Sequence, residues 1–100
     1  MASASAAVRA AHEVGADTVP QAELHLRLAQ EEIGRAQRLI RDDEMEDATR
    51  ALRRAQADAE LSLAITRAHA SREAAVEAER RADTESSQVT MPSSQAQAVR

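Results

Sequence analysis

A chain of 100 residues with a formal net charge of −4 is long enough for a single domain. It has 24 alanines and no aromatic residue, lysine or cysteine, which argues against an enzyme pocket, usually walled by aromatic side chains, and excludes thiolate or disulfide chemistry. Interspersed charges of both signs also argue against nucleic acid or anionic lipid as partner, since both favour basic surfaces. We therefore expect a non-enzymatic helical module without catalytic residues or a cofactor.

The first expected helix covers about residues 3–14. Its helix propensity is high, but its only large apolar residues are two valines, so we expect it to be weak. Gly15 ends it, and Pro20 begins the next helix, where the missing N–H of proline is not needed. Thr18 and Gln21 have the spacing of a capping box.

Residues 20–41 are expected to form the second helix. Its apolar residues recur in steps of 4-3-4-3-4, which is the heptad pattern of a packed seam. An acidic turn follows, in which Asp43 and Glu46 have the spacing of a second capping box. A turn this short predicts antiparallel neighbours. The seam residues are Ala22, Leu26, Ala29, Ile33, Ala36 and Ile40.

Residues 43–82 are expected to form a third helix, free of Gly and Pro. One apolar row on it follows an 11-residue period, which favours a straight or slightly right-handed pairing. A second row beside it indicates a second neighbour, or a groove for a partner helix around Leu61, Ile65 and Ala68. The first row is Leu52, Ala55, Ala59, Leu63, Thr66, Ala70 and Ala74, and the second is Ala57, Leu61, Ala64, Ile65, Ala68 and Ala75.

These elements predict an all-α fold: an antiparallel helical hairpin with a weak N-terminal helix. The large apolar residues are too few for a self-sufficient core, so we expect a homodimer in which two hairpins form a four-helix bundle. The helical domain is expected to cover residues 1–83, and the polar composition of 84–100 predicts a disordered tail or linker. The residues expected to carry packing or assembly are Leu26, Ile33, Ile40, Leu52, Leu61, Leu63 and Ile65.

Two other functions remain open from the residues alone. A metal-binding bundle would use His25 and His69 with nearby carboxylates, although no His lies three or four residues from another and the Glu-x-x-His step of di-iron bundles is missing. We therefore assign no metal ligand. The acidic turn fails as a calcium loop, because Asp47 and Arg53 stand where glycine and glutamate are required. The second alternative is a cytoplasmic coiled-coil adaptor.

The segments Val19–Ala36 and Ala48–Ala64 resemble an uncharacterised domain of bacterial envelope proteins, over about residues 19–70. The shared marks are a Pro-x-x-Glu helix start, Leu-Ala repeats and the segment Ala55–Leu61. Such proteins are typically Ala-rich lipoproteins, some with an OmpA-like domain downstream, which this chain does not contain. The resemblance implies a periplasmic or outer-membrane-anchored hairpin with an envelope protein partner. Ala2-Ser3 is typical of the residues that follow a lipidated cysteine. The lipid on that cysteine would be the protein's only attachment to a membrane.

Overall fold

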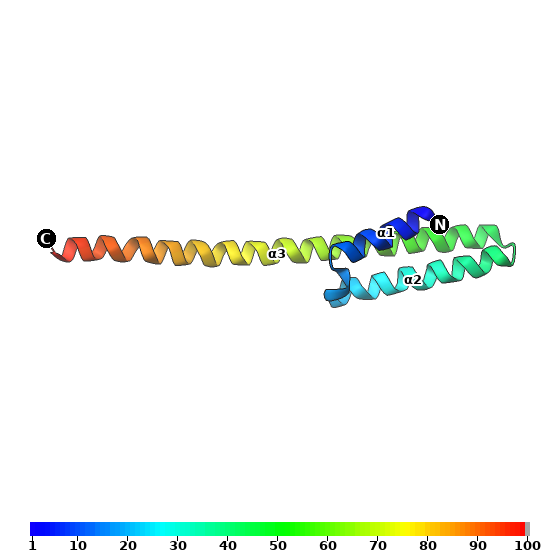
Figure 1. Ribbon diagram of the computed structural model, residues 1–100, viewed down its shortest axis with the longest axis horizontal. Coiled ribbons are helices and arrows are strands. Elements are labelled where there is room, and N and C mark those ends of the chain that lie inside the picture. Colours follow the sequence, from blue (N-terminus) through cyan, green and yellow to red (C-terminus); the bar gives the residue numbers. More distant parts are fainter. Residues whose placement is uncertain (100) are drawn as a thin grey trace. The chain divides into compact units, whose positions relative to one another are not determined.

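The computed structural model describes the backbone of residues 1–99 and the side chains of residues 1–88. Within that range the protein has helices and no strand, which confirms the predicted all-α class. The chain divides into two units, Met1–His69 and Ala70–Arg100, each considered by itself below. The elements are α1 (Ala2–Glu13), the 3₁₀ helix η1 (Ala16–Thr18), α2 (Pro20–Arg41) and α3 (Met45–Val99) (Figure 1).

The break between α1 and α2 is built on Gly15. Its φ of 89° lies in the left-handed region that glycine adopts without steric cost. The hydroxyl of Thr18 donates to the Gly15 carbonyl at 2.6 Å, so this side chain closes the turn instead of capping α2. Val19 is the N-cap without a side-chain bond, and α2 begins at Pro20. The predicted capping box of Thr18 and Gln21 is therefore wrong, whereas the predicted helix start is confirmed.

The turn between α2 and α3 is built on Asp43, which has a φ of 59°. Its N–H bonds the carbonyl of Ile40, and the N–H of Glu44 bonds the carbonyl of Leu39 at 2.8 Å. These two bonds form a Schellman motif with Asp43 in the position usually taken by glycine. Asp43 thus closes α2 and cannot cap α3, so the second predicted capping box is also wrong. Instead the Glu44 carbonyl accepts the N–H of Ala48 as α3 begins.

Replacing Asp43 with glycine should stabilise the protein. A side chain in the left-handed region costs about 1–2 kcal/mol, and the greater freedom of glycine in the unfolded chain offsets part of that gain. We expect Asp43→Gly to raise the free energy of unfolding in urea by up to about 1 kcal/mol. Asp42→Gly is the matched control: its φ of −88° suits any residue, so this change should destabilise. Equal losses in both variants would contradict the described turn.

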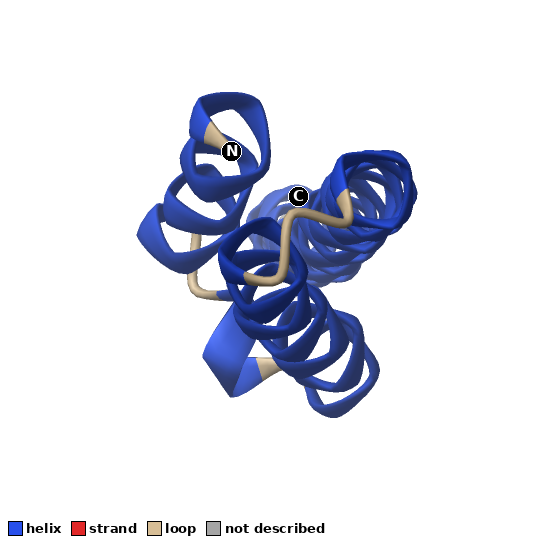
Figure 2. Cartoon of the chain, turned by 90° about the vertical axis from the view of Figure 1, so that its right-hand side faces the viewer, coloured by secondary structure: helices blue, strands red, loops and turns tan. Residues whose placement is uncertain are grey.

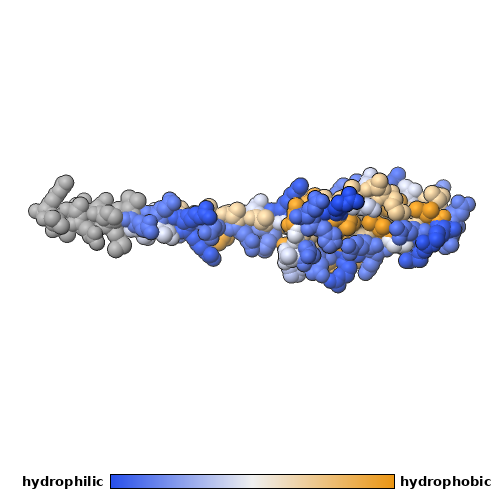
Figure 3. Space-filling view, viewed as in Figure 1, coloured by the Kyte–Doolittle hydropathy of each residue, from blue (hydrophilic) through white to orange (hydrophobic). Residues whose placement is uncertain are grey.

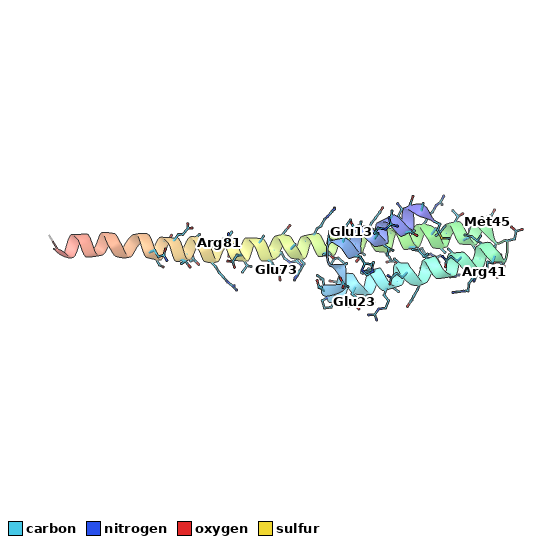
Figure 4. All side chains as sticks on the ribbon, viewed as in Figure 1. Glu13, Glu23, Arg41, Met45, Glu73 and Arg81 are labelled. Carbon is cyan, nitrogen blue, oxygen red and sulfur yellow. The ribbon has the colours of Figure 1, made fainter. Side chains whose placement is uncertain are left out.

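In the unit Met1–His69, α2 and the first part of α3 run in opposite directions. The hydroxyl of Ser62 donates to the Ala22 carbonyl at 2.7 Å. One turn further along α2, His25 Nδ1 lies 3.1 Å from Oδ1 of Asp58, which comes one turn earlier on α3. Figure 1 shows the same course, and Figure 4 places Arg41 and Met45 together at the turn.

Helix α1 lies on one side of this pair of helices, as the end-on view of Figure 2 shows. Its Ala4 packs in a cluster with residues of both α2 and α3. The amide of Gln30 on α2 also lies 3.2 Å from the ring Nε2 of His12 on α1. The core of this unit consists almost entirely of small side chains, because ten of its eleven buried hydrophobic residues are alanine and the other is Leu26. The helices therefore meet through small side chains, with larger half-buried residues such as Leu52 and Leu63 packed beside them.

The buried row of α3 keeps the predicted 11-residue period and includes Ala55, Ala59 and Thr66 of the predicted row, but Ala51 and Ser62 take the places predicted for Leu52 and Leu63. Leu52 and Leu63 are half-buried beside the row, where they pack against the two core clusters. Small residues occupy the line along which α3 meets α2, because larger side chains on that line would hold the two helices apart. Ser62 is fully buried there, and its hydroxyl is satisfied by the carbonyl of α2. The buried residues are Ala48, Ala51, Ala55, Ala59, Ser62 and Thr66.

In the unit Ala70–Arg100, α3 continues to Val99, and every described side chain from 70 to 88 is exposed. The backbone of residues 84–99 is helical, and the disordered tail or linker expected for 84–100 stays a prediction. Polar composition rules out a buried face, but it does not prevent a helical backbone, and residues 84–88 contain no Gly or Pro. The hydroxyl of Thr84 also bonds the Arg80 carbonyl, an arrangement compatible with a helix. The domain boundary after residue 83 stays a prediction.

Candidate interaction surface

The structure distributes the seven residues predicted for packing or assembly over three environments. Leu26 is 2% exposed in the core, whereas Leu61 and Ile40 are 45% and 37% exposed. The other four are half-buried. Ile33 and Leu52 pack against the cluster around Ala29. Leu63 and Ile65 pack against the cluster around Leu26. Their part in assembly stays a prediction.

The side of the α2–α3 pair that faces away from α1 forms a distinct surface. On α2 the spacing of His25, Leu28 and Glu32 places their side chains on one side of the helix. The contact between His25 and Asp58 joins this side to the corresponding side of α3. Gln30, which contacts α1, lies about 140° further round α2, so α1 leaves this side uncovered. We name the surface the open α2–α3 face; it comprises His25, Leu28, Glu32, Arg54, Asp58 and Leu61.

Two leucines of the open α2–α3 face remain accessible to solvent. Leu28 is 38% exposed, and Leu61, on the other helix, is 45% exposed. In a unit whose own interior is nearly all alanine, these are among the largest apolar side chains. Figure 3 shows that hydrophobic residues also reach the surface elsewhere on this unit, bordered by hydrophilic ones. Singly exposed leucines are ordinary on a protein surface, and these two lie about 9 Å apart along the helices, in opposite directions from the contact of His25 with Asp58.

Glu32 gives this surface an unusual electrostatic feature. Its Oε2 atom is buried and has no hydrogen-bond partner among the described residues. The guanidinium Nη1 of Arg35 lies 4.0 Å from that oxygen, beyond hydrogen-bond distance. The Glu32 side chain as a whole is 25% exposed and forms an ion pair with Arg35 over this distance, so solvent screens its charge.

Sequence reasoning found Leu61 but missed Glu32. Glu32 stands beside Glu31 and three residues before Arg35, so it is indistinguishable from a solvated row of alternating charges. The available signal was its spacing: Glu32 follows Leu28 by one turn and therefore shares the side of α2 that carries an exposed leucine.

Of the two histidines named for a metal site, His25 has a defined neighbour. The ring Nδ1 of His25 contacts Oδ1 of Asp58 at 3.1 Å. Among the residues whose side chains the structure describes, no group of three or more His, Cys, Asp or Glu is arranged to hold a metal ion. Over the same residues no helix is both long and apolar enough to cross a bilayer.

Comparison with known proteins identifies one relationship. The family model with the description "Domain of unknown function (DUF4398)" matches residues 1–78. This match covers all of α1 and α2 and the first part of α3. No curated protein and no solved structure matches the chain.

Proposed function

We propose that this chain, which belongs to the family described as a domain of unknown function (DUF4398), is a non-enzymatic helical interaction module that assembles as a homodimer. The observation that carries the proposal is the contrast between an alanine interior and the exposed Leu28 and Leu61 on a single face. Full burial of one exposed leucine contributes about 1.5–3 kcal/mol. Leu28 and Leu61 are already more than half covered, so a contact covering both on each copy would add part of that amount at each site.

The proposed assembly uses α2 and the first part of α3 as an antiparallel hairpin. Two hairpins stacked through their open faces make a four-helix bundle with antiparallel neighbours throughout. Helix α1 would then lie on the outer side of each hairpin, because it occupies the side opposite the open face. This arrangement buries apolar surface without displacing any contact within the chain.

We further propose that the module works in the bacterial cell envelope. The support is the resemblance of residues 19–70 to the envelope domain described above. Fractionation of cells that produce the native protein, followed by immunodetection, should find it in the periplasmic or outer-membrane fraction. Recovery from the cytoplasm alone would contradict the envelope role and favour the adaptor, without affecting the proposed assembly.

The proposed dimer is tested by the mass in solution. Light scattering over a range of concentrations should give about twice the chain mass of 10.8 kDa, with a helical circular dichroism spectrum. A variant with both Leu28→Glu and Leu61→Glu should have the mass of one chain and remain helical. Val14→Glu is the matched control, because Val14 is exposed at the end of α1 and lies outside the open face. A helical wild-type protein with the mass of one chain at every concentration would contradict the proposal.

A further inference from the structure

We infer that α1 is a strap that unfolds and leaves the α2–α3 pair as a unit, pivoting at Gly15, while α2 and the first part of α3 stay paired. The inference does not depend on the proposed homodimer, because it concerns contacts within one chain. It starts from a difference between two interfaces of the unit Met1–His69: α1 is attached through small side chains, whereas α2 and α3 have a longer contact of their own.

The side chains that attach α1 are all small. Ala4 and Ala11 are its buried residues, and Ala7 and Val8 are partly buried against the core clusters. Because hydrophobic stabilisation is roughly proportional to the apolar area removed from water, these residues hold α1 weakly. The polar contact between His12 and the amide of Gln30 lies at the surface, where water competes for both groups.

The α2–α3 pair has attachments that do not involve α1. The hydroxyl of Ser62 donates to the Ala22 carbonyl, and His25 contacts Asp58. Part of the alanine core also lies away from α1, because three buried residues belong to neither of the clusters that α1 joins. These residues are Ala36, Ala48 and Ala51. The pair should therefore persist when α1 leaves.

Gly15 separates the strap from the rest of the unit. Ala16, the next residue, is fully buried in the cluster around Leu26, and Val19 packs against the same cluster, so η1 stays with α2. Val14, on the other side of the glycine, is 43% exposed. Glycine changes its backbone angles at little steric cost, so the chain can turn at this position without disturbing η1.

Undocking of α1 should coincide with its unfolding. The helix has 12 residues, a length at which an isolated helix is marginal in water. The strap therefore undergoes a local transition between order and disorder, at a lower free energy than global unfolding. Its departure uncovers Ala29, Ala55 and Ala59, together with the half-buried Ile33 and Leu52 that pack against them. The strap thus controls the exposure of an apolar line on the α2–α3 pair.

The first test is amide hydrogen exchange of the wild-type protein at several urea concentrations below the unfolding transition. Relative to an unfolded chain, the amides of residues 8–12 should exchange at least about tenfold faster than those of residues 26–33. Their rates should also depend less on urea, because opening α1 alone exposes little surface. One protection factor and one urea dependence shared by both segments would overturn the inference, since α1 would then open only with the whole unit.

The second test is thiol labelling beneath the strap. The chain has no cysteine, so Ala29→Cys introduces a single thiol in the cluster that Ala4 joins. Ala36→Cys is the matched control, because Ala36 is equally buried seven residues further along α2 and lies outside both clusters. The thiol at position 29 should react with iodoacetamide at least about tenfold faster than the thiol at position 36.

Equal labelling rates in two variants that circular dichroism shows to be folded would overturn the inference. If either variant does not fold, the exchange measurement on the wild-type protein decides between the two outcomes. Neither result bears on the proposed homodimer, which is tested by the mass in solution.

Discussion

Leu26→Ala is expected to lower the free energy of unfolding by about 2–5 kcal/mol. Leu26 is the one large hydrophobic side chain that the core buries, and it packs in a cluster with Ala11, Ala16 and Ala22. Alanine neighbours have no rotamers with which to fill the space that the leucine leaves, so the cavity should persist. Unfolding in urea, followed by circular dichroism, measures the effect.

Leu24→Ala is the matched control for this prediction. Leu24 lies two residues earlier on α2 and is 54% exposed, so its truncation should change stability by less than about 0.5 kcal/mol. Leu63→Ala is the intermediate case, at a residue that the sequence assigns to packing or assembly. Because Leu63 is half-buried, its loss should fall between the two. Similar losses for Leu24 and Leu26 would contradict the described core.

Ala59→Leu is expected to destabilise the protein by at least about 1–3 kcal/mol, through overpacking. Ala59 is fully buried where α1, α2 and α3 meet, in a cluster with Ala4, Ala29 and Ala55. A leucine there requires the helices to separate, and α1 should move first because it is short. The measurement is the unfolding transition, together with amide hydrogen exchange in α1.

Ala57→Leu provides the control for overpacking. Ala57 is exposed two residues earlier on the same helix, and leucine is nearly as good a helix former as alanine. This variant should retain wild-type stability and normal exchange in α1. If Ala59→Leu were as stable as Ala57→Leu, the close approach of the three helices would be refuted.

The helix boundaries show what local signals can specify. The range 20–41 is confirmed to the residue, because Pro20 fixes its start and the acidic turn its end. The predicted start of α3 at residue 43 is two residues early, since a left-handed residue there closes the preceding helix instead. That conformation is usual for glycine and enriched in aspartate, but an aspartate at this position is equally suited to a helix N-cap, so the local sequence did not decide which helix Asp43 would serve.

The buried row of α3 shows where local signals are insufficient. Hydrophobicity selected Leu52 and Leu63 for the contact line, whereas the structure places alanines and Ser62 there. The period could be predicted because it depends on the helix alone. Ala55, Ala59 and Thr66 of the row were predicted as well, but Ala51 and Ser62 were not, because their burial depends on how closely α2 approaches and on the Ala22 carbonyl, 40 residues away in sequence, that accepts the hydrogen bond of Ser62. Glu32 escaped prediction for a similar reason, since its burial depends on tertiary packing and not on its charged neighbours.

The most direct test of the account is an isotope-filtered nuclear Overhauser experiment on an equimolar mixture of ¹³C-labelled and unlabelled wild-type chains. The account predicts intermolecular contacts to the methyl groups of both Leu28 and Leu61, since both lie on the open α2–α3 face. Contacts restricted to the methyls of Ala57, Ala64 and Ala68, the exposed row of α3, without any to Leu28, would contradict that face. The absence of any intermolecular contact would contradict the homodimer itself.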